Sequence, residues 1–361
     1  MANVMNLESH TNSAYSEQIQ CHGCSQGSRI PNNPAHFEQW LSGKEPGPLV
    51  VEAGISHGCN HHCQHCSYQQ FAPFGKKKRF IDSTIFHNFL DDFRSMGGVK
   101  IYFAGEGEPL LHPDFGKFLQ HAADLGLQVE LSSNGQLLNE KKLHEVLPFM
   151  QWIRFSVNGG DPQTYAQVHH CNSREFRRLE EILRAAVNYR NSHKYACLLT
   201  IQCIAYQANW SSIPGVIALH QRIGTDALVL RGVVENLEHE EKEIPREVIT
   251  LLKESENVAG VQVRWDSFLK LSANPKWKRC DGIYFRTNVD SSGNLFTCPR
   301  HFHIESSYGN LKSARFRDIW HSEKRRHLFA ACAKGEEITL CAKWCPSSLD
   351  NIFLGTLTDH E

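Results

Sequence analysis

The sequence has almost no net charge, because 38 Lys and Arg residues stand against 39 Asp and Glu residues in 361. A chain without a basic excess has no overall field that attracts nucleic acid or anionic membranes. Long apolar runs are also missing. Lys100, Arg154 and Arg231 interrupt the most hydrophobic stretches, and none approaches the roughly 20 residues that a membrane span requires. We therefore expect neither a nucleic-acid partner nor a membrane partner.

A signal-peptide core and an even number of cysteines are missing as well. The segment from Met1 to Gln20 is polar, which predicts a cytoplasmic location. The chain has 13 cysteines, a number that cannot all pair with one another. In a reducing compartment cysteines are more often metal ligands or thiols than disulfides. We therefore expect metal sites rather than a disulfide framework.

From residue 49 onward, short apolar runs alternate with amphipathic stretches, a rhythm that predicts repeated βα units and a parallel sheet. The expected strands are 49–55, 99–104, 128–132, 152–157, 197–205 and 227–230, and the expected helices are 83–95, 113–125, 140–146, 175–191 and 213–223. Six units are too few to close an eight-stranded barrel. The predicted fold class is α/β, a partial (β/α)6 TIM-like barrel with its active face at the carboxyl ends of the strands.

Composition predicts four parts. Residues 1–48 form an N-terminal extension, residues 49–245 the partial barrel, and residues 246–275 a connecting segment with a helix near 246–254 and a strand at 261–265. Residues 276–361 are rich in Cys, Gly and aromatic residues and form a small C-terminal domain. Its hairpin signal is the turn Asp290-Ser-Ser-Gly293 between two short strands.

Cys59, Cys63 and Cys66 follow the first strand with the spacing C-x3-C-x2-C. Three thiolates can hold one side of an iron-sulfur cluster and leave the fourth iron without a protein ligand. Two alternatives stay open from the spacing alone. One is an electron carrier, which normally supplies four cysteines per cluster. The other is a structural zinc site, for which the available histidines are His57, His61, His62 and His65.

Two further motifs follow the second and third expected strands, namely Phe103-Ala-Gly-Glu-Gly-Glu-Pro109 and Ser132-Ser-Asn-Gly135. With the cysteine triplet, they resemble the radical S-adenosylmethionine (SAM) superfamily over about residues 49–230. The resemblance implies a 4Fe-4S cluster on Cys59, Cys63 and Cys66, whose fourth iron chelates the amino and carboxylate groups of SAM.

The same resemblance implies a set of SAM contacts. Gly105, Gly107, Glu108 and Pro109 fall in the family's Gly-Gly-Glu-Pro region, where the glycine lets the backbone approach the SAM amino group and the glutamate accepts a hydrogen bond from it. Glu106 stands where the family often has glycine. The remaining implied SAM contacts are Ser133, Asn134, Ser156 and Asn158 at strand tips, Tyr68 at the adenine, and His65 at a position that is usually a carbocyclic aromatic.

The dipeptides Asn134-Gly135 and Asn158-Gly159 are also common turn formers, so a turn and a binding role are both open at these strand tips.

Four later cysteines, Cys280, Cys298, Cys341 and Cys345, are enough to close a 4Fe-4S or a zinc site. Their arrangement resembles the twitch domain, a shortened SPASM domain, which implies an auxiliary 4Fe-4S cluster. The last pair has three intervening residues where the family usually has two. Other candidates are weaker: Cys332 as a substitute ligand, Cys21 and Cys24 as an extra metal site, Cys171 as a thiol hydrogen donor, and Lys76 to Arg79 as an anion contact.

Three functions follow. The first is hydrogen abstraction from a small molecule such as a sugar, aminocyclitol or nucleotide sugar, leading to dehydrogenation or epimerisation. The alternative is a maturase that modifies a ribosomal peptide or a protein side chain, against which the 48-residue extension is short for a peptide-recognition domain. The third is a non-enzymatic iron-sulfur or zinc scaffold. Either enzyme needs an electron donor such as flavodoxin or ferredoxin.

The cysteine triplet gives the first prediction. Replacing Cys59, Cys63 or Cys66 by alanine removes one of three iron ligands, and we expect each variant to lose reductive SAM cleavage. The measurement is the yield of 5′-deoxyadenosine after anaerobic reconstitution and addition of dithionite and SAM. A normal yield from any of the three variants contradicts the assignment.

Overall fold

The computed structural model describes residues 29–66, 68, 79–233, 244–268, 279–298, 306–333 and 347–358. Its main element is a ten-stranded sheet in the order β12-β11-β10-β1-β4-β5-β6-β7-β8-β9. The strands are β1 (Val50–Ala53), β4 (Lys100–Phe103), β5 (Gln128–Ser133), β6 (Trp152–Ser156), β7 (Leu198–Ala205), β8 (Ala227–Gly232), β9 (Val261–Arg264), β10 (Arg286–Val289), β11 (Asn294–Phe296) and β12 (Ser307–Asn310). A separate two-stranded sheet pairs β2 (Ser56–His57) with β3 (Arg79–Phe80).

All neighbours from β10 through β1 to β9 are parallel, and only β11 and β12 are antiparallel additions. The six predicted strands are confirmed. The helix predicted near 246–254 and the strand predicted at 261–265 are also confirmed, as Arg246–Ser255 and β9. Beyond the six predicted strands, β9 and β10 extend the parallel run at its two sides. Among the described strands, β12 and β9 end the sheet, so the barrel is open.

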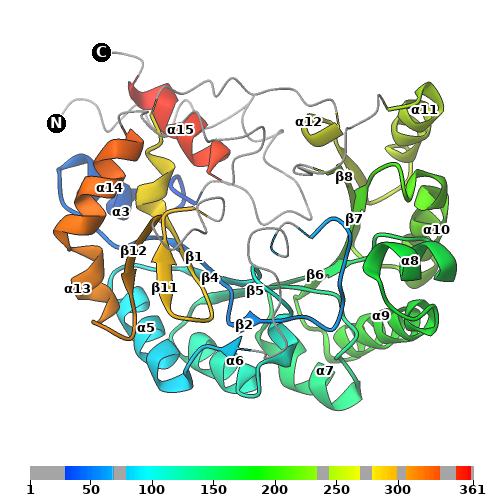
Figure 1. Cartoon of the computed structure of the whole chain (residues 1–361), viewed down its shortest axis with the longest axis horizontal. Coiled ribbons are helices and arrows are strands. Elements are labelled where there is room, and N and C mark those ends of the chain that lie inside the picture. Colours follow the sequence, from blue (N-terminus) through cyan, green and yellow to red (C-terminus); the bar gives the residue numbers. More distant parts are fainter. Residues whose placement is uncertain are drawn as a thin grey trace.

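Helices cover the outer side of the curved sheet, as Figure 1 shows for α5, α6, α7, α9 and α10. The helices are α3 (Pro34–Leu41), α5 (Ser83–Ser95), α6 (Phe115–Asp124), α7 (Glu140–Val146), α8 (Pro162–His169), α9 (Arg174–His193), α10 (Ile213–Ile223), α11 (Arg246–Ser255), α12 (Trp265–Phe268), α13 (Phe316–Trp320), α14 (Glu323–Ala333) and α15 (Ser348–Thr358). No helix in the described ranges has both the length and the apolar character needed to cross a bilayer.

The core lies between the sheet and these helices. Side chains alternate along each strand, so Val51 and Ala53 of β1 and Ile101 and Phe103 of β4 all point outward and are fully buried. Phe86 of α5 packs on this face against other aromatic rings. In these strands every second side chain is apolar and packs against the helices, and the side chains between them face the concave side of the sheet.

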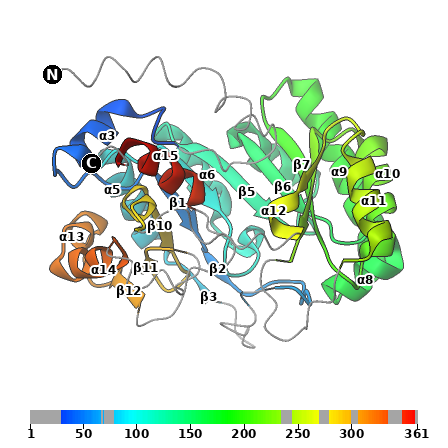
Figure 2. The same cartoon turned by 90° about the horizontal axis from the view of Figure 1, so that it is seen from above.

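The N-terminal helix α3 packs on the C-terminal part of the chain. Phe37 shares a small apolar cluster with Phe285 and Leu354, and its ring meets that of Phe353 edge-on. Figure 2 places α3 beside α15. Residues from the predicted extension therefore help to cover the C-terminal region, while the predicted domain boundaries themselves stay a prediction.

Candidate functional site

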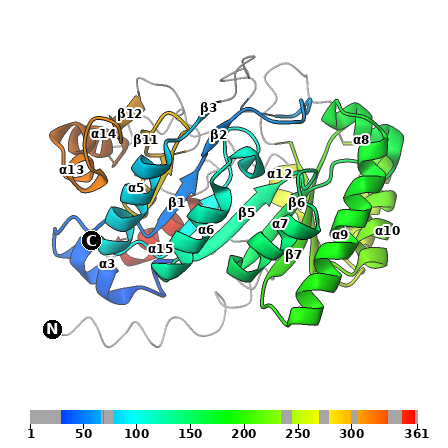
Figure 3. The same ribbon diagram turned by 90° about the horizontal axis from the view of Figure 1, so that it is seen from below.

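The cysteine loop, residues 58–66, follows the short strand β2, which pairs with β3. After β1 the chain forms β2, which pairs antiparallel with β3, so Ser56 faces Phe80 and His57 faces Arg79. Figure 3 shows β2 and β3 beyond the carboxyl end of β1. Because both ends of the excursion are fixed by this pairing, the three cysteines are held over the carboxyl edge of the sheet.

The three cysteines share one short loop, in which the N–H of Cys66 donates to the carbonyl of Cys63 at 3.2 Å. Cys59 Sγ accepts from the backbone N–H of His61 at 3.4 Å and lies 3.6 Å from Asn134 Nδ2. Burial raises the pKa of Cys59 to about 12, and the charges of Glu108 and Cys66 add to the rise. Burial also raises the pKa of Cys63, and Cys66 and Cys59 are the next contributors.

The loop after β4, from Gly105 to Pro109, lies directly against the cysteine loop. Gly107 has a φ of +96°, and a Cβ there would lie 2.3 Å from the carbonyl oxygen of Gly58 and 2.4 Å from that of Ser56. The next N–H, of Glu108, donates to Gly58 O at 3.0 Å. Glycine at position 107 is therefore required by contact between two backbones of this chain.

The carboxylate of Glu108 is buried and joins two loops. It accepts from Ser133 Oγ at 2.8 Å and from the backbone N–H of Asn134 at 2.9 Å. It also accepts from the N–H of Leu110 at 3.2 Å, which caps the short 3-10 helix that begins at Pro109. Burial raises its pKa while these donors oppose the rise. Glu108 thus fixes the tip of β5, and the expected bond to the SAM amino group stays a prediction.

Glu106, whose role the sequence left open, connects the site to the C-terminal hairpin. One carboxylate oxygen lies 2.8 Å from His57 Nδ1, and the other accepts from the backbone N–H of Ser291 at 2.6 Å. The guanidinium of Arg79 lies 3.7 Å away and also donates to Ser291 Oγ. A glycine at this position would remove the contacts of Glu106 to His57 and Ser291 and leave only Arg79 to join the β2–β3 pair to the β10–β11 turn.

Asn134 and Asn158 organise the strand tips. Asn134 Oδ1 accepts from the N–H of Gln136, which confirms the predicted turn at Asn134-Gly135. Asn158 Oδ1 accepts from the N–H of Ile204 at 2.7 Å, so its Nδ2 is free to donate to His65 Nε2 at 3.0 Å. Burial lowers the pKa of His65 to about 4. These two asparagines bind the protein's own loops, and their contacts to SAM stay predictions.

The other predicted SAM contacts are placed around the same edge. Ser156 is the last residue of β6 and pairs with Gln202 of β7. The ring of His65 lies among protein rings, 5.8 Å from Tyr206 and 6.2 Å from His169. Tyr68 donates from its hydroxyl to Glu52 at 3.2 Å, and a Cβ at Gly105 would lie 3.8 Å from that hydroxyl.

Sequence reasoning missed α8 and with it His169. The signal was present in Asp161-Pro162, where Asp161 caps the helix by accepting from the N–H groups of Gln163 and Thr164. His169 at its end is fully buried and lies 3.1 Å from Cys63 Sγ. His61, Cys63 and His169 converge with ligand atoms within 4.8 Å, as do His61, Cys171 and Glu175.

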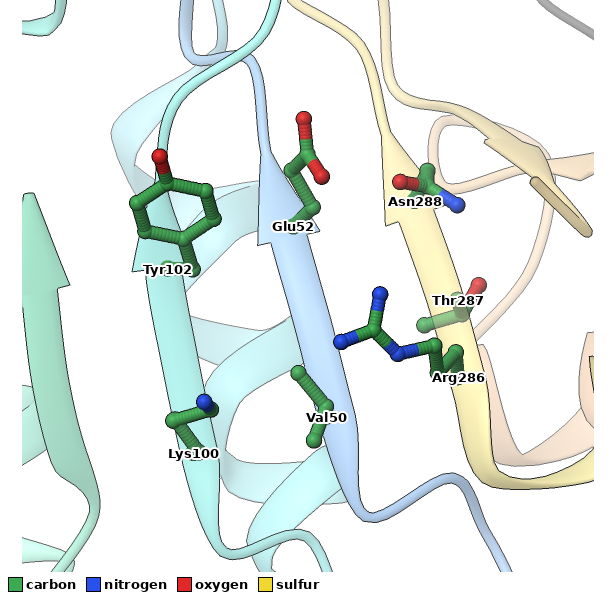
Figure 4. A pocket seen from close by; sticks show the side chains of 7 residues that line it. All are labelled: Val50, Glu52, Lys100, Tyr102, Arg286, Thr287 and Asn288. Carbon is green, nitrogen blue, oxygen red and sulfur yellow. The ribbon is translucent and has the colours of Figure 1, made fainter. Parts of the chain in front are cut away.

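The concave face beside the cysteine loop is polar. Figure 4 shows a pocket there with Lys100 and Tyr102 from β4, Val50 and Glu52 from β1, and Arg286 to Asn288 from β10. Lys100 lies 3.2 Å from Glu130 Oε2, and burial lowers the pKa of Lys100 to about 8. Burial raises the pKa of Glu52, while Arg286 and Arg154 lower it. A charged substrate group entering this face meets charges of both signs.

Only part of the second cysteine set lies in the described residues. Cys280 is buried and its Sγ accepts from Asn351 Nδ2 of α15 at 3.3 Å, while Asn351 Oδ1 accepts from the N–H of Gly282. Cys298 follows β11 and is half-buried. The predicted site residues that lie outside the described part of the chain are Cys341, Cys345, Cys21, Cys24 and Lys76 to Lys78.

The other cysteines have plainer surroundings. Cys332 is buried in α14 within the apolar core, and Cys197 and Cys203 are buried in the core at β7, as expected for packing residues. Cys171 is half-buried, and burial and then the charge of Glu175 raise its pKa to about 12.

The donors around the triplet fit an iron-sulfur cluster better than zinc. The three cysteines lie in one loop between residues 59 and 66, which matches a cluster bound through three irons. Within the described residues, the zinc-like combination of His61, Cys63 and His169 uses only one of these cysteines. A zinc ion bound by these three residues would not use Cys59 or Cys66 as ligands.

The backbone contact at Gly107 gives the second prediction. Gly107→Ala would force apart the cysteine loop and the Gly105–Pro109 loop, so we expect loss of most of the iron bound at the triplet and a lower free energy of unfolding. The matched control is Gly126→Ala, because Gly126 also has a positive φ, +71°, but nothing lies within 4 Å of the added Cβ. Iron analysis and denaturant unfolding are the measurements. Equal effects in the two variants would show that only backbone strain matters.

Comparison with known proteins agrees with this geometry. The Radical SAM superfamily profile matches residues 54–201, and the profile of the SPASM iron-sulfur cluster-binding domain matches residues 280–346. PqqA peptide cyclase of Xanthomonas campestris pv. campestris is 26% identical over 51% of this chain and 46% of its own length. The chain thus spans about half the length of the peptide cyclases it matches.

Two further likenesses cover more of the chain. The tungsten-containing aldehyde ferredoxin oxidoreductase cofactor-modifying protein of Pyrococcus furiosus is 22% identical over 77% of this chain and 84% of its own length. The structure of Streptococcus suis SuiB bound to precursor peptide SuiA superposes with a TM-score of 0.61 at 12% identity, over 81% of this chain and 69% of that one. The likeness to SuiB shows a shared fold. From the two domain matches and the three motifs in their place at the sheet edge, we conclude that the chain belongs to the radical SAM superfamily and ends in an iron-sulfur cluster-binding SPASM domain.

Proposed function

We propose that this chain is a radical SAM enzyme that modifies a peptide or protein substrate. The observation that carries the proposal is the position of the loop that bears Cys59, Cys63 and Cys66. The β2–β3 pairing and the bond from the N–H of Glu108 to Gly58 hold this loop at the carboxyl edge of an open parallel sheet. The substrate class is supported by similarity to a peptide cyclase and by a fold shared with a protein solved with its precursor peptide.

A bound 4Fe-4S cluster would supply one electron that splits a carbon–sulfur bond of SAM into methionine and a 5′-deoxyadenosyl radical, which then takes a hydrogen atom from the substrate. The three cysteines would hold that cluster. Glu108 keeps the tips of β4 and β5 in one arrangement, and Asn158 holds His65 against the tip of β6. Together they give SAM a rigid, largely buried edge on which to be oriented.

The substrate would lie on the concave face, where Glu52 is the central side chain. Its carboxylate is linked to the cysteine loop region through Tyr68 and lies near Arg286 of the C-terminal hairpin. The parallel part of the sheet begins at β10 and ends at β9, and these two strands do not pair with each other in the described sheet, so the barrel has an open side. An open side of this kind suits a substrate that is part of a longer chain.

Sequence analysis placed small molecules first and peptides second. The comparisons favour the second, so the short N-terminal extension is a poor guide to substrate class in this chain. The electron donor, for which flavodoxin or ferredoxin is the expected type, and the cytoplasmic location stay predictions. Cys280, Cys298, Cys341 and Cys345 remain our proposed ligands of the auxiliary cluster.

The proposed ligand set gives the third prediction. Cys280→Ala removes a sulfur that Asn351 already orients, and we expect the iron content of the reconstituted protein to fall from about eight to about four per chain while 5′-deoxyadenosine formation persists. The matched control is Cys203→Ala, which removes an equally buried cysteine from β7 and should leave about eight irons. Unchanged iron in Cys280→Ala would show that Cys280 is not a ligand.

The substrate class gives the fourth prediction. We expect the reconstituted enzyme with SAM and dithionite to change the mass of a small protein encoded beside its gene. The change is about two mass units if a new cross-link forms with loss of one hydrogen atom to the 5′-deoxyadenosyl radical, one proton to solvent and one electron to the auxiliary cluster. Intact-mass spectrometry is the measurement, and Cys59→Ala is the control that should leave the mass unchanged. Turnover of UDP-sugars or aminocyclitols with every neighbouring small protein unchanged would return the chain to the small-molecule function.

A further inference from the structure

The C-terminal end of helix α8 accepts two backbone hydrogen bonds from the cysteine loop. The backbone N–H of His62 donates to the carbonyl of His169 at 3.1 Å, and that of Gln64 donates to Val168 at 3.0 Å. These acceptors belong to the last turn of α8, whose carbonyls have no partners inside the helix. The segment that carries Cys63 therefore has a fixed position relative to the helix end.

The same helix end places an imidazole beside a ligand sulfur. His169 is fully buried, and its Nδ1 lies 3.1 Å from Cys63 Sγ. On the other side of the ring, Nε2 lies 3.1 Å from the backbone nitrogen of Asn158 and 3.4 Å from its Nδ2. The ring is thus held between a main-chain group and a cysteine.

The partners of the ring decide where its proton is. A backbone N–H can only donate, so Nε2 of His169 must accept the bond from Asn158 and carries no proton. A neutral imidazole has one N–H, which must then be on Nδ1 and must point at the sulfur of Cys63. The contact is therefore an N–H···S hydrogen bond with the sulfur as acceptor.

Hydrogen bonds to the sulfur ligands are one of the factors that set the reduction potential of an iron-sulfur cluster. A donor at a ligand sulfur stabilises the state with more negative charge, and it does so strongly in a buried, low-dielectric place. We propose that His169 is a positioning residue that donates a hydrogen bond to Cys63 and thereby raises the reduction potential of the SAM-cleaving cluster. This inference rests on the proposed placement of that cluster on Cys59, Cys63 and Cys66.

The main competing role is direct ligation. The ligand atoms of His61, Cys63 and His169 are close enough to share a metal ion. In that case Nδ1 would lose its proton and the sulfur would lose its donor. The two roles differ in how strongly the histidine nitrogen couples to the reduced cluster, so spectroscopy of the full chain separates them.

The test is an EPR-monitored redox titration of the reconstituted full-length protein, following the signal that changes on addition of SAM. His169→Phe keeps a ring but removes the donor. We expect the ratio of reduced to oxidised cluster at a fixed potential to fall about tenfold, which is about 59 mV for one electron. His169→Asn places an amide N–H near the position of Nδ1 and should restore much of the difference. The control is His170→Asn, at an exposed neighbour whose φ of +47° asparagine tolerates.

Equal potentials in wild type, His169→Phe and His169→Asn would overturn the proposal. Because His169→Phe leaves the buried N–H of Asn158 without its acceptor and so lowers the free energy of unfolding, a measurement on wild type accompanies it. With histidine 15N-labelled only at the ring nitrogens, so that the backbone N–H of His61 at Cys59 gives no 15N signal, we expect a weak ring-nitrogen coupling to the reduced cluster that is lost in His169→Asn. A coupling of the size of a direct ligand, or none at all, would overturn the proposal. Absence of any SAM-sensitive cluster signal would instead refute the cluster placement itself.

Discussion

The backbone at Gly107 runs against the backbone of Ser56 and Gly58 with no space for a side chain between them. This contact fixes the position of the cysteine loop relative to the sheet. The N–H of Glu108 donates to Gly58 in the cysteine loop, and the carboxylate of Glu108 accepts from the N–H of Asn134 at the tip of β5. Glu106 extends the same chain of contacts to the C-terminal hairpin. Three segments that are distant in sequence are therefore positioned by one stretch of five residues.

The sequence was sufficient for the parts that local pattern determines. Helices α5, α7 and α10 have the predicted bounds because capping residues and apolar spacing define them, and the three motifs follow consecutive strands at one sheet edge as parallel topology requires. It was not sufficient where the partner of a residue is remote. The sequence around Glu106 does not predict that its side chain binds His57 and Ser291, and the sequence around His169 does not predict its contact with Cys63.

The concave face illustrates the same limit. Strands of four to six residues contain only two or three inward positions each, so the polar series Glu52, Tyr102 and Glu130 is visible only when the register aligns neighbouring strands. Charges of both signs then occupy one surface, with Lys100 against Glu130 and the carboxylate of Glu52 near Arg286. If the proposed function holds, such a face would discriminate among peptides by where their polar side chains fall.

The pairing of β10 with β1 has a mechanical consequence. A strand from the C-terminal part completes the hydrogen bonds of the first strand of the barrel over four residue pairs, and α3 covers the same region from the amino-terminal side. The part of the chain that bears Cys280 is thus not a tethered module but an extension of the same sheet. Cutting the chain before β10 would leave β1 with an unpaired edge, the kind of surface at which sheets recruit foreign strands.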